Sequence, residues 1–287
     1  MKKINVGAGA RWHESGWEVL DNGSGDYSPA WKHKGKCWDS GLPSSTYDIV
    51  FCSHMLEHVP HFRLERTIAE FNRILKVGGT IRILVPDLRG AARAYVEGDI
   101  GYFSDGIHFT DHLGIGGAFV RTIISPGKQT LAVSREFDEI IGSYGHLYGF
   151  DSEMLSIVLE KWGFGSIQDS KPGKSRLESL QPFQHLVHNG QAYSTDDPFV
   201  ATGEFQRTGH PWHFGGFDKR SNKQIAVEAV KVEDRPYAFE NEYPFSKAGR
   251  VESRRDRLKL LAFGGISRLI DGTYAAAKTV GLLRLLR

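Results

Sequence analysis

The strongest constraint on the fold is an alternation of short apolar runs with helical patterns over residues 3–90. Four apolar runs are typical of buried strands, at 3–6, 17–20, 47–52 and 81–85. Between the last two, apolar residues recur at helical spacing over 64–75, and Gly78-Gly79 is a typical helix end. Alternation of this kind predicts a parallel sheet with helices on both faces.

The same pattern returns in the second half of the chain. Asp151 is a suitable N-cap for a helix that runs through Trp162, where Gly163 interrupts it. Two further strands are predicted, at 166–168 and 224–231. These elements complete an α/β fold that we expect to be Rossmann-like and doubly wound, with a mostly parallel seven-stranded sheet.

Two segments without this alternation, 99–148 and 175–222, are predicted to be insertions. We therefore expect one domain over residues 1–232, followed by a linker and a helical C-terminal tail over 233–287. A hydrophobic content of 40% and a charged content of 24% are ordinary for a globular protein.

The composition also points to a compartment. The two cysteines, Cys37 and Cys52, cannot form a disulfide framework, which favours a reducing environment. The N-terminus has no apolar signal segment, and no stretch is long and uncharged enough to span a bilayer. A cytoplasmic protein is the expectation.

Charge is distributed unevenly along the chain. Residues 250–287 hold nine basic and three acidic side chains, which is +6, so the net charge of +2 leaves −4 for the rest. A mildly acidic body argues against a nucleic-acid partner. The tail has an apolar stripe flanked by arginines, which can lie on an anionic membrane surface or dock on its own domain or a second subunit.

A glycine pair follows the first predicted strand. Gly7 and Gly9 allow a sharp turn and a close approach of the backbone to a ligand. Asp21, at the end of the next strand, is suited to bind ribose hydroxyls, but it lies only 12 residues after Gly9. In dinucleotide-binding sites this acid lies about 20 residues after the glycines, and a third glycine is present. This chain has neither feature and also lacks a Tyr-x-x-x-Lys pair, so the pattern disfavours an NAD-dependent oxidoreductase.

Four sequence motifs occur in an order that resembles one known family. They are Asn5-Val6-Gly7-Ala8-Gly9 followed by the segment 16–21 ending in Asp21, the segment 47–59 with Leu56-Glu57-His58, the segment 75–83 with Lys76-Val77-Gly78-Gly79, and the segment 159–164 ending in Gly163-Phe164. Together they resemble class I S-adenosylmethionine-dependent methyltransferases of the Methyltransf_11 type. The resemblance covers most of residues 3–90 and 146–168, and it implies S-adenosyl-L-methionine as the cofactor.

The resemblance implies a cofactor-binding role for seven residues. Gly7, Ala8 and Gly9 would pass under the methionine part, Asp21 would hold the ribose, Asp39 would contact the adenine, and Ser53 and His54 would face the methionyl group.

Methyl transfer to a hydroxyl also requires removal of a proton. Asp87, just after the strand at 81–85, and His58 are the predicted bases. The structural alternatives are a helix cap for Asp87 and a half-buried supporting histidine for His58. Sequence alone does not rank three other candidates, His108, His112 and His146.

The string His54-Met55-Leu56-Glu57-His58 also matches the inverted zinc-protease motif. If His54 still belongs to the strand, the two imidazoles would not share one helix face. No third ligand follows at a sequence spacing typical of this motif, so we expect no metal site.

Residues 183–214 are unusually rich in aromatic rings. Such rings can bind sugars or planar acceptors, or they can form a small subsidiary core. The resemblance to this methyltransferase family suggests O-methylation of a small-molecule or glycan acceptor, with a role in polysaccharide biosynthesis. The rivals are an NAD-dependent oxidoreductase and a catalytically inactive, methyltransferase-like binding module.

Overall fold

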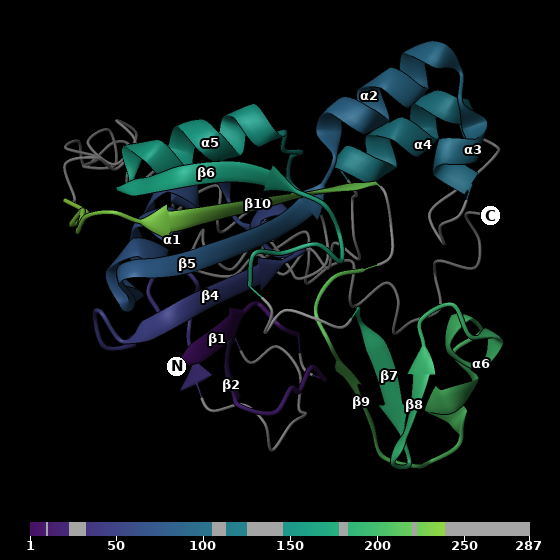
Figure 1. Ribbon diagram of the computed structural model, residues 1–287. Helices are drawn as coiled ribbons and strands as arrows, with labels where there is room; N and C mark the ends of the chain where they lie inside the picture. The colour runs from purple at the N-terminus through teal and green to yellow at the C-terminus, as the bar shows by residue number, and fades with distance from the viewer. Residues whose placement is uncertain are drawn as a thin grey trace, which may run out of the picture. The chain divides into compact units, whose positions relative to one another are not determined.

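The computed structural model describes residues 1–9, 11–22, 33–104, 113–124, 146–177, 183–219 and 223–238 (Figure 1). The predicted tail helix and two of the candidate histidines, His108 and His112, lie outside these residues.

A seven-stranded sheet is the centre of the fold, with the strand order β3-β2-β1-β4-β5-β10-β6. In that order the strands are His33–Lys34, Trp17–Asp21, Lys3–Val6, Tyr47–Ser53, Leu75–Pro86, Gln224–Lys231 and Phe164–Ser170. The first five strands are parallel, and β10 is antiparallel to both of its neighbours. The predicted Rossmann-like, mostly parallel sheet of seven strands is confirmed.

The helix before β5 ends earlier than the sequence suggested. Helix α1 spans His61–Ile74, and Leu75 is already extended, so Gly78-Gly79 belong to the long strand β5 and do not end the helix. The buried ammonium of Lys231 donates to the carbonyl oxygens of Asn72 and Leu75, each at 2.7 Å. These bonds satisfy carbonyls that a glycine cap would otherwise serve.

Helix α5, Ser152–Lys161, forms as predicted. The carboxylate of its N-cap, Asp151, accepts a hydrogen bond from the Met154 amide at 2.8 Å. The helix ends at Trp162, and Gly163, with φ +78°, turns the chain into β6. The predicted strand at 166–168 is the centre of this longer strand.

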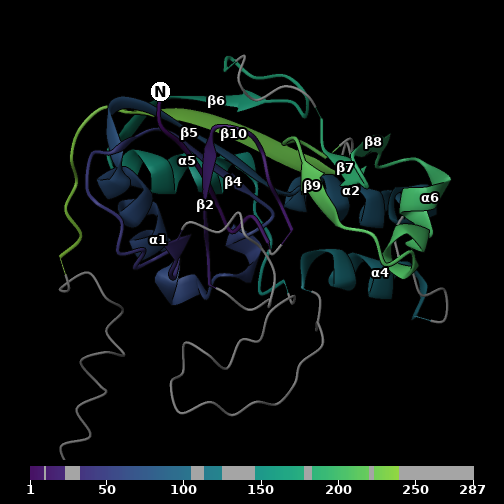
Figure 2. The ribbon, with the colours of Figure 1, turned by 90° about the horizontal axis from the view of Figure 1, so that it is seen from below.

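The two faces of the sheet are covered differently. Helices α1 and α5 pack on one face, where their apolar residues join those of β1, β4, β5 and β10 in the largest core cluster (Figure 2). In the described part of the chain, side chains of loops and strands cover the opposite face. The prediction of helices on both faces is therefore wrong for the described residues. The rings on this opposite face are Trp12, Trp17, Phe51 and Phe217, which contact one another edge-on or tilted. The ten-residue connection between β1 and β2 is too short for a standard crossover helix.

Three described helices lie beyond the end of β5: α2 Leu88–Glu97, which precedes the first insertion, and α3 Ile100–Ser104 and α4 Gly114–Ile123, which belong to it. They share a small core of their own, formed by Ala91, Ala94, Phe103, Ala118 and Ile123. Figure 1 shows this helical group at the end of the sheet to which the arrow of β5 points.

The second insertion contains a three-stranded antiparallel sheet, β8-β7-β9. Its elements are β7 His185–His188, β8 Gln191–Ser194, α6 Pro198–Ala201, a 3-10 helix Glu204–Arg207 and β9 Trp212–Gly215. Rings of His188, Phe199, Phe205 and Trp212 contact one another in series, with centroids 4.8–6.2 Å apart. This arrangement is the small aromatic core that was one of the two readings of residues 183–214.

None of the helices in the described ranges has the length and apolar character needed to cross a membrane.

Candidate functional site

The strand order places the site. The chain moves outward in one direction from β1 to β2 and in the other from β4 to β5, so β1 and β4 flank a topological switch point. In open α/β sheets, ligands bind in the crevice outside the carboxyl ends of such strands. Gly7 follows β1 at this edge, and His54 follows β4.

The turn after β1 requires glycine. Gly7 and Gly9 have φ of +76° and +75°, a region that other residues rarely adopt. A Cβ on Gly7 would lie 2.1 Å from Cγ of Met55, whereas a Cβ on Gly9 would meet nothing within 4 Å. The Gly7 amide donates to the carbonyl of Leu20 at 2.9 Å, which holds the bend against β2.

Asp21 points toward this bend. Its Oδ2 accepts a hydrogen bond from the Gly9 amide at 2.9 Å. The glycine turn and the Asp21 carboxylate are therefore brought together at the switch point, and ribose binding by Asp21 stays a prediction. Ala8, between the two glycines, packs on the aromatic cluster of the sheet.

Asp39 lies in the turn after β3, and its side chain is 72% exposed. Its amide donates to the carbonyl of Lys36, and its carboxylate lies 3.8 Å from the Arg66 guanidinium. This position leaves the side chain accessible, and its contact with an adenine stays a prediction.

The end of β4 bends sharply at His54, which has φ +51°. Its Nε2 lies 2.6 Å from Oε1 of Gln224. The Gln224 amide nitrogen donates to the carbonyl of Lys219, so Oε1 faces His54 and the imidazole Nε2 must be the donor. Its Nδ1 lies 3.2 Å from Oε1 of Glu57. Ser53, one residue earlier, is half-buried at the strand end.

Glu57 is the most unusual group in the site. It lies in a 3-10 helix, Leu56–His58, and its side chain is 0% exposed. Among the described residues, neither of its carboxylate oxygens accepts a hydrogen bond of good geometry. Burial acts to raise its pKa, but the contact with His54 and the charges of His54 and His58 outweigh burial, so the pKa is lowered and Glu57 is a carboxylate.

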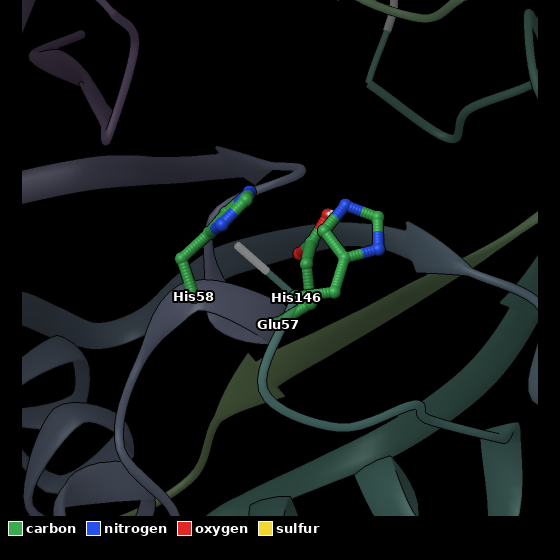
Figure 3. Close-up of side chains that lie close together, drawn as sticks. All are labelled: Glu57, His58 and His146. Atoms are coloured by element: carbon green, nitrogen blue, oxygen red, sulfur yellow. Dashed lines mark ion pairs between the residues drawn. The ribbon is translucent and has the colours of Figure 1, made fainter. Parts of the chain in front are cut away.

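Two histidines flank this carboxylate. His58 is half-buried, and its ring centroid lies 5.0 Å from that of His146, a residue of the first insertion. Nε2 of His146 lies 3.9 Å from Oε1 of Glu57. In Figure 3 the Glu57 carboxylate lies between the two rings. His54 precedes the short helix, so His54 and His58 do not share a helix face. This position argues against the inverted zinc-protease motif.

Asp87 has a structural task at the end of β5. Its carboxylate caps α2 by accepting from the Gly90 amide at 2.9 Å. Burial, together with the charge of Asp87, raises the pKa of Tyr102 to about 12. Asp87 also lines a cleft of about 550 Å³ between the starts of α2 and α5, with Arg89, Arg93 and Asp151. Asp87 therefore caps a helix, as the structural alternative predicted, and the role of Asp87 as a base stays a prediction.

Two participants were missed by sequence reasoning, and neither carried a signal in the sequence: Met55 packs over Gly7, and Gln224 orients His54. His146, one of the three candidate histidines that the sequence did not rank, reaches Glu57 from far along the chain.

Comparison with known proteins gives one family match and several similar solved structures. Residues 25–83 match the family model described as a methyltransferase domain. No curated protein matches the sequence. Among solved structures, an S-adenosylmethionine-dependent methyltransferase from Archaeoglobus fulgidus is 12% identical, with a TM-score of 0.40 over 80% of this chain and 86% of that one. A possible histamine N-methyltransferase from Thermotoga maritima is 11% identical, with a TM-score of 0.35 over 80% and 81%.

The strand order, with the glycine turn and the Asp21 carboxylate at the switch point, is that of a Rossmann-like, doubly wound sheet. Residues 25–83, which are 59 of the 287 residues, are thus similar to a methyltransferase domain.

The contact between Met55 and Gly7 gives a direct test of the turn. We expect Gly7→Ala to lower the free energy of unfolding by about 2–4 kcal/mol, because it adds a clash to the strain of a positive φ. Gly9→Ala, in open space, should cost about 1–2 kcal/mol. Urea denaturation measures both, and Met55→Ala should recover part of the Gly7→Ala loss. Equal losses for the two glycines would contradict this packing.

Proposed function

We propose that the protein transfers the methyl group of S-adenosylmethionine to an oxygen atom of a small-molecule or glycan acceptor. The observation that carries the cofactor half of the proposal is the bond between the Gly9 amide and the Asp21 carboxylate at the switch point. When bound, the cofactor supplies an electrophilic methyl group on a positively charged sulfur.

The chain's own residues would bind and orient. Gly7 lets the backbone approach the methionine part, Asp21 holds the ribose, and Asp39 is the proposed adenine contact. Ser53 and His54 would border the methionyl group from the end of β4. Positioning of this kind supplies much of the rate of a group transfer, because it fixes the acceptor in line with the methyl group.

At the acceptor end, His58 is the group that we propose acts on the acceptor hydroxyl. It belongs to the short helix that follows Met55, the side chain that packs on the glycine turn. Asp87 is the second candidate, because it lines the cleft at the end of β5.

A transfer assay with methyl-labelled S-adenosylmethionine and a panel of sugars and small alcohols tests this function. His58→Gln should lower kcat by about 100-fold, the range that proton removal contributes, and leave cofactor affinity unchanged. Asp87→Asn serves as the comparison and should retain most activity. An equal loss in Asp87→Asn would move the base there. Cofactor binding without turnover on any acceptor would favour the inactive binding module, and binding of NAD would favour the oxidoreductase.

Location and pathway stay predictions from the sequence. Cytoplasmic location, polysaccharide biosynthesis and a domain boundary at 232 belong to this group. So do the absence of a nucleic-acid partner and membrane contact through residues 250–287. Deleting 250–287 and measuring liposome sedimentation would test the last, since unchanged binding would rule out the tail as the anchor.

A further inference from the structure

We propose that Glu57, His58 and His146 form a binding site for a divalent transition-metal ion. One carboxylate oxygen and one nitrogen from each ring all lie within 4.8 Å of one another. Metal–ligand bonds of about 2.0–2.2 Å place ligand atoms roughly 3–3.5 Å apart, so small side-chain rotations would complete the site.

The buried carboxylate is the independent observation that points to a ligand. Glu57 is 0% exposed, and no described residue gives either oxygen a hydrogen bond of good geometry. A buried charge left in this condition costs free energy that a bound cation would offset. His54 Nδ1 lies 3.2 Å from one of the carboxylate oxygens, but this contact does not have the geometry of a hydrogen bond. Among the described residues, the carboxylate therefore has no well-aligned donor, and a metal ion would supply the missing contact.

The surrounding contacts orient the proposed ligands. Nδ1 of His146 lies 3.0 Å from the carbonyl oxygen of Thr122, which can only accept, so Nδ1 carries the proton and Nε2 is the nitrogen that faces Glu57. The Leu147 amide donates to the carbonyl of Glu57 at 2.7 Å, which fixes His146 beside the short helix. Such outer contacts are typical of metal-binding histidines and raise their basicity.

His54 completes the support from the other side. Its Nδ1 lies against Glu57, and its Nε2 is bonded to Gln224 on β10. Both nitrogens of His54 are thus occupied, so it is a supporting residue of the site. The ligand set is therefore His58, His146 and one carboxylate, which differs from the zinc-protease reading of the motif and replaces the expectation that the chain binds no metal.

Donor chemistry selects the ion. Two imidazoles and one carboxylate suit borderline cations such as Zn²⁺, Co²⁺ or Fe²⁺ better than Mg²⁺, which prefers oxygen ligands. Three protein ligands leave coordination positions open, as in catalytic metal sites. If the proposed methyl transfer holds, which this role rests on, the open position would bind the acceptor oxygen and lower its pKa, with His58 acting through the metal ion.

Calorimetric titration of the full, chelator-treated chain with Zn²⁺ tests the site, without cofactor or acceptor. We expect one equivalent to bind. Glu57→Gln and His146→Gln should each weaken binding by at least about 100-fold, because a direct ligand should matter no less than an outer-shell contact. His61→Gln is the matched control, since His61 is exposed and lies just after the cluster, and it should change affinity by less than about threefold.

Co²⁺ absorption in the visible range, lost in His146→Gln, would confirm a histidine ligand, and thermal melts in chelator would show that each variant is folded. The absence of stoichiometric Zn²⁺ binding by the wild type, or equal affinity in His146→Gln, would overturn the proposal. Titration with S-adenosylhomocysteine in chelator reports separately on the cofactor site, so the two proposals fail independently.

Discussion

Replacing Asp21 with alanine is expected to weaken the binding of S-adenosylhomocysteine by about 100- to 1000-fold. The carboxylate is proposed to accept both ribose hydroxyls, and hydrogen bonds to a charged group contribute about 1.5–3 kcal/mol each. Water replaces part of each lost bond, so we expect a loss near the low end of that range, which is about 3–4 kcal/mol of binding free energy for the two bonds. Calorimetric titration measures the change.

Two further variants make this test specific. Asp21→Asn keeps an oxygen that can accept from the Gly9 amide but removes the charge, so we expect a loss of about tenfold. Asp169→Ala removes an exposed carboxylate from β6, at the opposite edge of the sheet, and should leave affinity unchanged. Full affinity in Asp21→Ala would show that the ribose is held elsewhere.

The largest expected loss of stability follows from Arg82→Met. The Arg82 guanidinium is 0% exposed and is paired with Asp218 and Glu228, which are 2% and 0% exposed. Removing the cation leaves two buried carboxylates without their main partner. Breaking a buried network in this way costs about 3–5 kcal/mol. Urea denaturation should show this decrease in the free energy of unfolding.

Arg89→Met is the matched control for this prediction. Arg89 also pairs with two carboxylates, Asp151 and Glu153, but its side chain is 63% exposed. Exposed pairs contribute about 0–1 kcal/mol, so the control should be close to wild type. A loss below 1 kcal/mol in Arg82→Met would mean that water or rearrangement compensates the two carboxylates.

The Arg82 network also matters for the site. Asp218 adjoins Lys219, whose carbonyl orients Gln224 and through it His54. Glu228 lies on β10, the same strand as Gln224. The buried arginine therefore ties the second insertion to the strands that hold the end of β4.

The sheet could be predicted from the sequence because its strands are local apolar runs. The strands at 3–6 and 224–231 have the predicted bounds, and the strands at 17–20 and 47–52 extend by one residue each. The Asp151 cap is equally local, since donor and acceptor are three residues apart. The match of Gly9 with Asp21 could be predicted because parallel strands end at one edge of a sheet.

What could not be predicted depends on contacts between distant segments. The second face of the sheet is covered by rings from Trp12 and Phe217, and no periodic pattern joins them. The cap of α1 is a lysine on β10, more than 150 residues later. Likewise, His146 meets Glu57 only because an insertion returns to the carboxyl edge of β4. Periodicity identifies elements, and these pairings arise from how the elements pack.

The most direct test of the cofactor site is a crystal structure of the protein with S-adenosylhomocysteine. We predict that both ribose hydroxyls donate to the Asp21 carboxylate and that the homocysteine part lies over the Gly7–Gly9 turn. A nucleoside bound in another crevice, or an Asp21 side chain turned away from the sugar, would contradict the account.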